Sequence, residues 1–454
     1  MRLSVSQARY NYLISLALLL SALPFLLNLK RFQQLFWFGD ELHLLSEIRH
    51  AGFWTWTFDM FAENFVPLFK LLWGGAAIVF DGSYFAMVCI VWGTHLLNVY
   101  LMARLLQQLK LPAIAVFTAC VTLGVTYTNI EALCWTVQWS STFSLTFFLL
   151  ASILLVKIMY ANEHTAVNAA LHWWHYAAYL LALVCGVLCF SRGVISCAAL
   201  VAFILIHWHF SFRRPYKGLW LAALTFLPAL VVGLIIVTRS GGNTKQLAGI
   251  DYQTFAAMFE FGAYYFLLNP LFRFFNFLQP FQDGVPYLLG LGTLKLAILV
   301  WGFYAARNAG RMLTLFLAFL VIFDLSNAAV LGIGRYHEGL NNAVVSRYQY
   351  TSLISFVPFL GLITAHALSA LKQRMKLYTT AATALLSVWI FIIGTPWHKE
   401  MKSWSRWHGR QGRNLILRGK VPRNRLLQHG LWIGLPPIIS LEEAQAVAKE
   451  FNLH

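Results

Sequence analysis

Charged residues are scarce in this sequence. Asp, Glu, Lys and Arg together make up 11% of the 454 residues, whereas a soluble domain carries roughly 25%. Hydrophobic residues make up 59%, and the mean hydropathy is +0.64. This composition excludes an ordinary soluble fold and predicts a protein that crosses a membrane many times.

Several familiar chemical motifs are also missing. The sequence has no P-loop, no dinucleotide-binding fingerprint and no HExxH pair, so it indicates neither nucleotide nor zinc-protease chemistry. Its six cysteines fall mainly inside apolar runs, where a buried thiol is the usual interpretation. No cofactor is assigned, and a divalent metal would need acidic ligands that the sequence does not mark.

Long apolar runs dominate the chain. A helix needs about 17 to 25 residues to cross the hydrocarbon core, and about eleven runs qualify. They lie near 11–29, 84–106, 112–128, 138–158, 174–190, 194–210, 218–237, 287–304, 312–331, 349–368 and 377–394. The first has no clear cleavage site after it and is predicted to stay as a helix. Up to thirteen spans result if ambiguous stretches, chiefly 250–286, also cross.

The stretch from Phe65 to Phe80 is apolar but is not counted as a span. Lys70 lies in its middle, and a central lysine costs roughly 2.5 to 3.5 kcal/mol on insertion scales. The stretch is also short and follows an aromatic-rich segment. We therefore expect a helix that lies in the membrane interface.

Basic residues are unequally divided between the two sets of loops. The N-terminus and the loops on its side collect Lys and Arg and hold one acid, Glu163, whereas the opposite loops carry both signs. Because basic residues favour the cytoplasmic side, the N-terminus is predicted to be cytoplasmic. The mixed-charge loops and the C-terminus are then outside, in a protein that suits a bacterial inner membrane.

The formal net charge of +17 does not indicate nucleic-acid binding. Much of the basic charge lies in the inner loops and in a C-terminal tail that mixes Arg with Trp, which suits lipid head groups or lipid-linked phosphates. Ser440 is predicted to cap a short helix from Leu441 to Phe451. We expect a transmembrane domain over 1–394, with a first outer loop over 30–83, and a basic extramembrane segment over 395–454.

The first outer loop carries an acidic pair, Asp40 and Glu41, followed by His43. Gly39 permits a tight turn, so Asp40 is predicted at the start of a helix, with its carboxylate open to a cavity. A simple helix cap is the alternative role for Asp40. His43 is a further candidate for the pocket.

A second outer site follows the ninth span. It contains Arg335, His337, Arg347 and Tyr348. Arginine at a helix entrance offers a fork of donors that matches phosphate oxygens, and the helix N-terminus adds partial positive charge. These residues suit a lipid phosphate or pyrophosphate, and an arginine that merely reaches the head groups is the alternative.

Three further polar residues are candidates. Arg192 lies in a polar break between two spans, and Glu131 occupies a short outer turn. Asp324 lies within the ninth span, where an ionisable group must face a cavity or a partner. It either lines a pocket or is a paired structural carboxylate.

These features resemble the GT-C superfamily, multi-spanning glycosyltransferases that use a polyprenyl-phosphate-linked sugar donor. The chain looks most similar to the protein mannosyltransferase and lipid A aminoarabinose transferase types. The resemblance rests on the uncleaved first span, the first-loop acids, a membrane-parallel segment and a late arginine, which read Gly39-Asp40-Glu41, Asn64-Phe65-Val66-Pro67-Leu68 and Ser346-Arg347-Tyr348. It implies an all-α membrane fold, interfacial helices in the first outer loop and a small C-terminal extramembrane subdomain.

The resemblance also implies roles for these residues. Asp40 is expected to act as catalytic base, with Glu41 as assistant or as the alternative base, while Arg347, Arg335 and Arg192 are candidates to bind the donor phosphate. A sugar would pass to a hydroxyl of a glycolipid, polysaccharide or protein, with inversion at the anomeric carbon. Two other classes stay open: a transporter or flippase of lipid-linked sugars, and an O-antigen polymerase or ligase.

Overall fold

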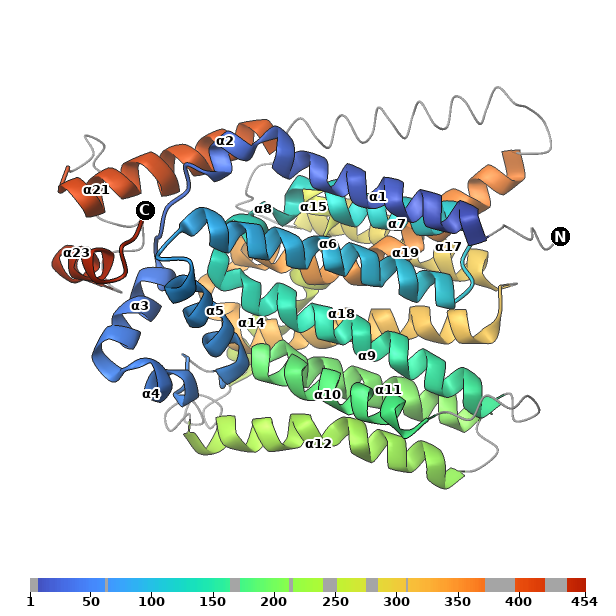
Figure 1. Ribbon diagram of the computed structural model, residues 1–454. Coiled ribbons are helices and arrows are strands. Elements are labelled where there is room, and N and C mark those ends of the chain that lie inside the picture. Colours follow the sequence, from blue (N-terminus) through green and yellow to red (C-terminus); the bar gives the residue numbers. More distant parts are fainter. Residues whose placement is uncertain are drawn as a thin grey trace.

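The computed structural model describes residues 7–61, 64–163, 172–211, 215–239, 251–274, 285–307, 309–371, 397–420 and 439–454. Regular structure in these ranges is helical, apart from a single β-bridge between Phe61 and Asn64. Long helices lie side by side in a bundle, and shorter helices gather at one end of it (Figure 1).

Eight helices among the described residues are long and apolar enough to cross a membrane. Seven of them are α1 (Gln7–Leu27), α6 (Tyr84–Gln108), α9 (Trp139–Glu163), α11 (Arg192–Ser211), α12 (Pro215–Arg239), α18 (Arg311–Arg335) and α19 (Ser346–Leu371). The eighth, Leu288–Ala306, joins η3 (Leu288–Gly292) and α17 (Thr293–Ala306). A ninth candidate is bent by 45°, between α7 (Ala113–Val125) and the turn formed by η1 (Tyr127–Asn129) and α8 (Ile130–Cys134).

Two further runs that were expected to cross the membrane are not among these candidates. The run near 174–190 forms α10 (Trp173–Cys189), a helix of 17 residues that is at the short limit for crossing. The run near 377–394 lies outside the described residues. The all-α membrane architecture is confirmed, and the count of eleven spans stays a prediction.

The ambiguous stretch near 250–286 contains an additional helix, α14 (Tyr252–Leu268), which packs against α18. α15 (Leu271–Phe274) follows it, and α16 (Val285–Tyr287) precedes η3. Two other short elements, η4 (Tyr336–Glu338) and η5 (Leu340–Val344), lie between α18 and α19. Residues 275–284 lie outside the described part.

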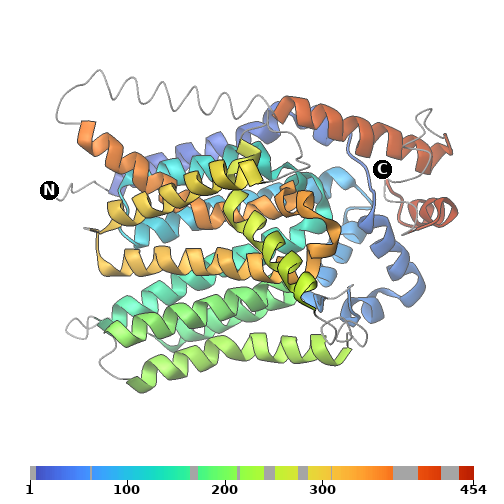
Figure 2. The ribbon, with the colours of Figure 1, turned by 180° about the vertical axis from the view of Figure 1, so that it is seen from behind.

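One end of the bundle holds the first loop and the C-terminal segment together, and we call it the loop end. It contains α2 (Leu29–Phe32), α3 (Asp40–Ala51), α4 (Phe53–Phe58), α5 (Pro67–Val79), η2 (Thr136–Gln138), η6 (Ser405–Gln411), α21 (Gly412–Arg418) and α23 (Leu441–Glu450). The N-terminus lies at the opposite end in both views (Figures 1 and 2). The bundle thus presents the first-loop helices and the C-terminal helices on a common surface.

Helix α5 shows why the stretch around Lys70 is not a span. The helix has 13 residues, and Lys70 is buried rather than exposed to lipid. Its ammonium group donates hydrogen bonds to the carbonyls of Trp56, Asp59 and Met60, at 2.9, 3.2 and 3.2 Å. Lys70 therefore joins α5 to the end of α4 and to the two residues that follow it, and these carbonyls supply the partners that its buried ammonium group needs.

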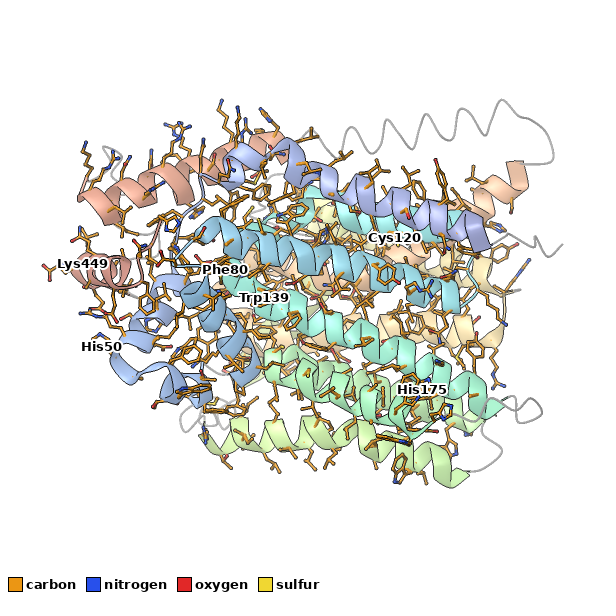
Figure 3. All side chains as sticks on the ribbon, in the orientation of Figure 1. His50, Phe80, Cys120, Trp139, His175 and Lys449 are labelled. Carbon is orange, nitrogen blue, oxygen red and sulfur yellow. The ribbon has the colours of Figure 1, made fainter. Side chains whose placement is uncertain are left out.

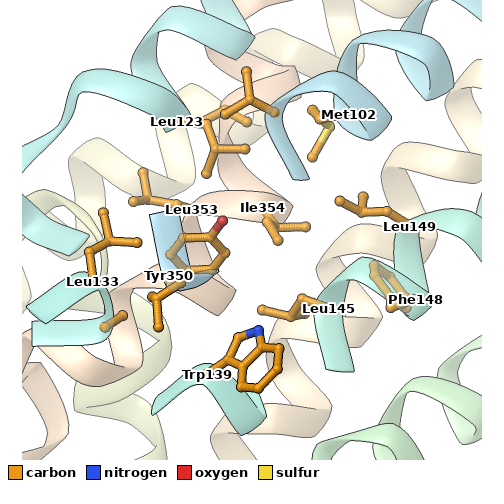
Figure 4. Close-up of a cluster of buried hydrophobic side chains, with 14 of the residues drawn as sticks. Met102, Leu123, Leu133, Trp139, Leu145, Phe148, Leu149, Tyr350, Leu353 and Ile354 are labelled. Atoms are coloured by element: carbon orange, nitrogen blue, oxygen red, sulfur yellow. The ribbon is translucent and has the colours of Figure 1, made fainter. Parts of the chain in front are cut away.

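Apolar side chains from distant helices meet in the middle of the bundle. Met102, Leu149 and Ile354 are among them, and Tyr350 brings a hydroxyl into the same cluster (Figure 4). The hydroxyl bonds Nδ1 of His95 at 2.9 Å and the amide of Asn98 at 3.2 Å. His95 also bonds the carbonyl of Gly124 on α7, and Asn98 donates to the carbonyl of Thr142 on α9. This buried network therefore joins four helices without facing lipid.

Candidate active site

Asp40 begins α3 at the loop end. The preceding residue, Gly39, has a φ of +57°, in the left-handed region where a side chain would be strained. The loop before it is anchored by Trp37, which is fully buried and donates from Nε1 to the carbonyl of Gly82 at 2.8 Å. An acidic residue in the first turn of a helix is also favoured by the helix dipole. The sequence therefore fixes where the Asp40 carboxylate leaves the backbone.

Glu41 is fully buried and has hydrogen bonds to both carboxyl oxygens. Oε1 accepts from the backbone N–H of Thr136 at 2.7 Å, from its hydroxyl at 2.5 Å and from the Tyr84 hydroxyl at 3.0 Å. Oε2 accepts from the N–H of Phe38 at 3.2 Å. Burial raises the pKa of Glu41 to about 8 against the opposing effect of these bonds. Glu41 joins the first loop to α6 and η2 and is closed to solvent.

Asp40 differs from its neighbour in exposure and in hydrogen bonding. Its side chain is half-buried, and no hydrogen bond connects its carboxylate to another residue in the described part of the chain. Burial raises the pKa of Asp40, while the positive charges of Arg347, His43 and Arg335 act to lower it. Three cations from two distant segments therefore lie within electrostatic reach of a carboxylate whose lone pairs are available.

Arg347 is held at the start of α19 by two acids. Its guanidinium lies 3.7 Å from Glu131 and 3.6 Å from Glu338, and it stacks over the Tyr348 ring at 5.2 Å. The backbone N–H of Arg347 also donates to Glu131 at 3.0 Å. A quarter of the Arg347 side chain stays exposed. The arginine is thus fixed in place with part of its donor fork facing outward.

Arg335 and His337 are more open. Arg335 ends α18, pairs with Glu338 at 2.5 Å, and has 46% of its side chain exposed. His337 is exposed and packs edge-on against Tyr336. Glu338 connects Arg335 to Arg347, so the two arginines form one cluster around a shared carboxylate.

His43 lies one turn along α3 from Asp40. Its Nε2 is 3.3 Å from Glu47, which also accepts a bond of 2.9 Å from the indole of Trp56. The hydrogen bond that His43 donates to Glu47 is the main cause that raises the pKa of His43, and the negative charge of Asp40 adds to it. His43 therefore binds a proton more readily than a free histidine does.

Arg192 and Asp324 are placed inside the bundle, away from the loop-end surface. Arg192 is buried and donates to the side chains of Asn327, at 3.1 Å, and Ser141. Asp324 is also buried and forms an ion pair of 2.8 Å with Lys295. The structure thus favours the paired structural role for Asp324. No hydrogen bond or ion pair in the described part of the chain joins Arg192 to Arg347, so the structure does not bring these two candidates together.

The structure also reveals partners that sequence patterns could not indicate. Tyr84 and Thr136 complete the Glu41 network, and Arg273, Glu400 and Trp404 line a cavity beside Glu131. Each is an ordinary residue in its own segment, so only the fold shows its relation to the site. No group of three or more potential metal ligands occurs among the described residues.

This arrangement can perform acid–base chemistry next to an anion. A half-buried carboxylate with free lone pairs can accept a proton from a hydroxyl within reach. A fixed guanidinium with exposed donors can stabilise a phosphate or another oxyanion nearby. Asp40 and Arg347 supply these two functions from segments about 300 residues apart in the sequence.

Comparisons with known proteins find similarity in structure and not in sequence. No protein-family model and no curated protein match the chain. The crystal structure of the Archaeoglobus fulgidus oligosaccharyltransferase tethered with an acceptor peptide matches over 99% of this chain and 68% of that chain, with a TM-score of 0.54 and 12% identity. Its apo form matches over 94% and 60%, with a TM-score of 0.51 and 14% identity.

A third solved structure is ArnT from Cupriavidus metallidurans bound to undecaprenyl phosphate. The match covers 99% of this chain and 78% of that chain, with a TM-score of 0.44 and 14% identity. The chain spans 60% to 68% of the length of the archaeal oligosaccharyltransferase in the two matches above. The GT-C-like fold implied by the sequence resemblance is confirmed by the archaeal structures.

Proposed function

We propose that this protein is a membrane glycosyltransferase that moves a sugar from a polyprenyl-phosphate donor to a hydroxyl group of a glycan, glycolipid or protein. The acceptor oxygen attacks the anomeric carbon, and the bond from that carbon to the phosphate oxygen breaks with inversion. Asp40 takes the acceptor proton, and the lipid phosphate leaves with its negative charge beside Arg347.

The difference between Asp40 and Glu41 is the observation that carries this proposal. Glu41 is enclosed and has four hydrogen bonds, so it positions the loop and cannot meet a substrate. Asp40 has none to a described residue and lies in the field of Arg347. A helix cap would instead bond the backbone N–H groups of the first turn. A catalytic base needs an accessible carboxylate with unoccupied lone pairs, and Asp40 has one.

The loop end is the proposed site of transfer, on the outer face of the membrane. This follows from the predicted cytoplasmic N-terminus, which lies at the opposite end of the bundle (Figure 1). The transporter alternative would need charged or polar groups that line a path between the spans. The intramembrane charges Lys295 and Asp324 are instead buried and paired with each other, which supports an enzyme over a transporter.

Donor dependence tests the phosphate site. Arg347→Ala should raise the apparent KM for a polyprenyl-phosphate sugar by about tenfold or more, the cost of a lost charge-assisted hydrogen bond. Arg347→Lys keeps the charge without the fork and should give an intermediate KM. The measurement is transfer of labelled sugar by the purified chain in lipid vesicles, over a series of donor concentrations. An unchanged KM in both variants would remove Arg347 from the donor site.

A further inference from the structure

A separate polar cavity lies next to the arginine cluster. It has a volume of about 170 Å³ and is lined by Tyr127, Thr128, Ile130, Glu131, Arg273, Ser346, Glu400 and Trp404. The lining comes from the turn after α7, the end of α15, the start of α19 and the C-terminal segment. Glu131 belongs both to this cavity and to the site around Arg347. A ligand in the cavity would therefore lie beside the proposed reaction centre.

The cavity has polar groups that the fold leaves available. Glu400 forms no hydrogen bond or ion pair with another residue of the described ranges. Arg273 donates from Nε to the carbonyl of Val344 at 2.9 Å, and its two terminal nitrogens have no hydrogen-bond partner in the described part. Ser346 is already occupied, because its hydroxyl bonds Thr128 and the N–H of Glu131. Glu400 and the outer edge of Arg273 can thus bond a ligand.

An aromatic ring completes the lining. Trp404 packs on Phe38 and His408, with ring centroids 5.8 and 4.5 Å apart, and also faces the cavity. These contacts hold the indole in place, because Phe38 itself is buried two residues before Asp40. A fixed aromatic ring beside hydrogen-bonding groups offers one apolar and one polar surface to the same ligand.

The charge of the lining selects among ligands. The lining holds two carboxyl groups and one guanidinium, and one of the carboxyl groups, Glu131, is paired with Arg347. The cavity therefore has no excess of positive charge with which to hold a phosphate or another anion. The cavity greatly exceeds the roughly 10–15 Å³ that holds one water, and it is smaller than the roughly 300–1,000 Å³ of a drug-sized pocket. A neutral, ring-sized group with many hydroxyls fits these limits. A sugar ring has such hydroxyls, together with C–H groups that can lie on an aromatic face.

We propose that this cavity binds one sugar residue of the acceptor, so that the acceptor is a glycan. The sugar would lie against Trp404 and hydrogen-bond to Glu400 and Arg273, which orients the next residue of the glycan toward Asp40. The role of this sugar as the acceptor rests on the proposed transferase function. Binding of a sugar in the cavity does not, and it can be measured without any donor.

The test is sugar binding by the full chain in lipid nanodiscs, without donor. The probes are mono- and disaccharides of glucose, galactose, mannose and N-acetylglucosamine, followed by saturation-transfer NMR. At least one probe should bind, and Trp404→Ala and Glu400→Gln should each weaken it by about tenfold. Glu400→Gln keeps the size and shape of the side chain, so it still tests the cavity if Trp404→Ala does not fold. Trp54→Ala is the matched control, because Trp54 is 68% exposed at the loop end and does not line the cavity.

Two outcomes would overturn the inference: no probe binds, or binding is the same in wild type, Trp404→Ala and Glu400→Gln. The Asp40→Asn variant separates this result from the proposed function. It should bind the sugar as wild type does while failing to transfer. Sugar binding without transfer from any lipid-phosphate donor would contradict the proposed function and leave the cavity assignment standing. If the protein transfers sugar but the cavity variants bind the probes as wild type does, the proposed function would stand and the cavity assignment would be contradicted.

Discussion

Asp40 and Glu41 are adjacent carboxyl groups with opposite surroundings. Rotation by one residue along a helix turns a side chain by about 100°, which is enough to direct one acid outward and the next into the protein. Sequence alone marked the pair but left the roles of its two members exchangeable. The distinguishing contacts come from Tyr84 and Thr136, which are distant in the chain. Local sequence could not supply them.

The raised pKa of Glu41 has a structural explanation. Burial makes the carboxylate costly to ionise, and the bonds that it accepts from Thr136, Tyr84 and Phe38 offset this cost only in part. The Tyr84 hydroxyl has a second acceptor, the carbonyl of Cys134 at 2.9 Å. Burial raises the pKa of both carboxyl groups, and the cations around Asp40 act against this rise.

Stability should depend on pH through Glu41. Its folded-state pKa of about 8 lies above the ordinary value of 4.5. The stabilising contribution of the protonated group is therefore complete below pH 4.5 and decreases as the pH rises through 8. Unfolding of the purified chain in detergent, followed at pH 5 and pH 9, should show a lower unfolding free energy at pH 9.

Glu41→Gln provides the comparison for this pH effect. It should remove most of the difference between pH 5 and pH 9 and reduce stability at pH 5 by on the order of 1–3 kcal/mol, because its amide nitrogen meets the N–H of Phe38. Glu442→Gln is the control, since Glu442 is an exposed acid. The same pH dependence in wild type and Glu41→Gln would contradict the assignment.

At the scale of elements, the helix that carries Asp40 is held by the C-terminal helix. Glu443 on α23 accepts from Ser46 at 2.7 Å and pairs with Arg49 at 2.9 Å and His50 at 3.1 Å. Arg49 also pairs with Glu450 at 2.8 Å. His50 and Lys449 mark the two helices at the loop end in Figure 3. The last helix of the chain thus stabilises the first-loop helix.

The sequence predicted part of this element. Ser440 caps α23 as expected, with its hydroxyl accepting from the N–H of Glu443 at 3.1 Å, and the helix ends at Glu450, one residue before the predicted end. The docking of α23 on α3 was not predictable, because it depends on side chains about 400 residues apart. The only trace of this docking in the sequence is a few charged residues on each helix. Such charges occur on most exposed helix faces and so do not predict a contact.

Glu443→Gln should loosen α3. The loss of its two ion pairs is expected to cost about 1 kcal/mol, or about fivefold faster hydrogen exchange of the α3 amides. Hydrogen exchange followed by mass spectrometry measures this over residues 41–51. Glu442→Gln is the matched control, since it makes the same chemical change at the neighbouring position of the same helix. Equal exchange in both variants would show that α23 does not stabilise α3.

At the scale of the whole molecule, hydrophobic runs predicted most of the bundle. Run length and composition report directly on a helix that must satisfy its own backbone in lipid, so eight long spans follow from the sequence. The bend after α7 was not predicted, because its apolar composition continues through the turn. That bend brings Glu131 to the start of α19, where it meets Arg347.

The candidate site depends on this global arrangement. Sequence patterns placed Asp40 and Arg347 on one face of the membrane by charge alone, and the structure brings them within electrostatic reach of each other. Glu338 comes from the same connection as Arg347, and Glu131 comes from a third segment, the turn after α7. Because the site is assembled from three separate segments, the sequence could name candidate residues but could not predict their geometry.

The rate of sugar transfer by Asp40→Asn tests the central claim most directly. The asparagine keeps the shape of the side chain and cannot accept the proton, so transfer at saturating donor should fall by about 10²- to 10⁴-fold. The donor KM and the unfolding temperature should stay close to those of wild type. Transfer at the wild-type rate by a folded Asp40→Asn protein would contradict the account, because the acceptor proton would then leave by another route.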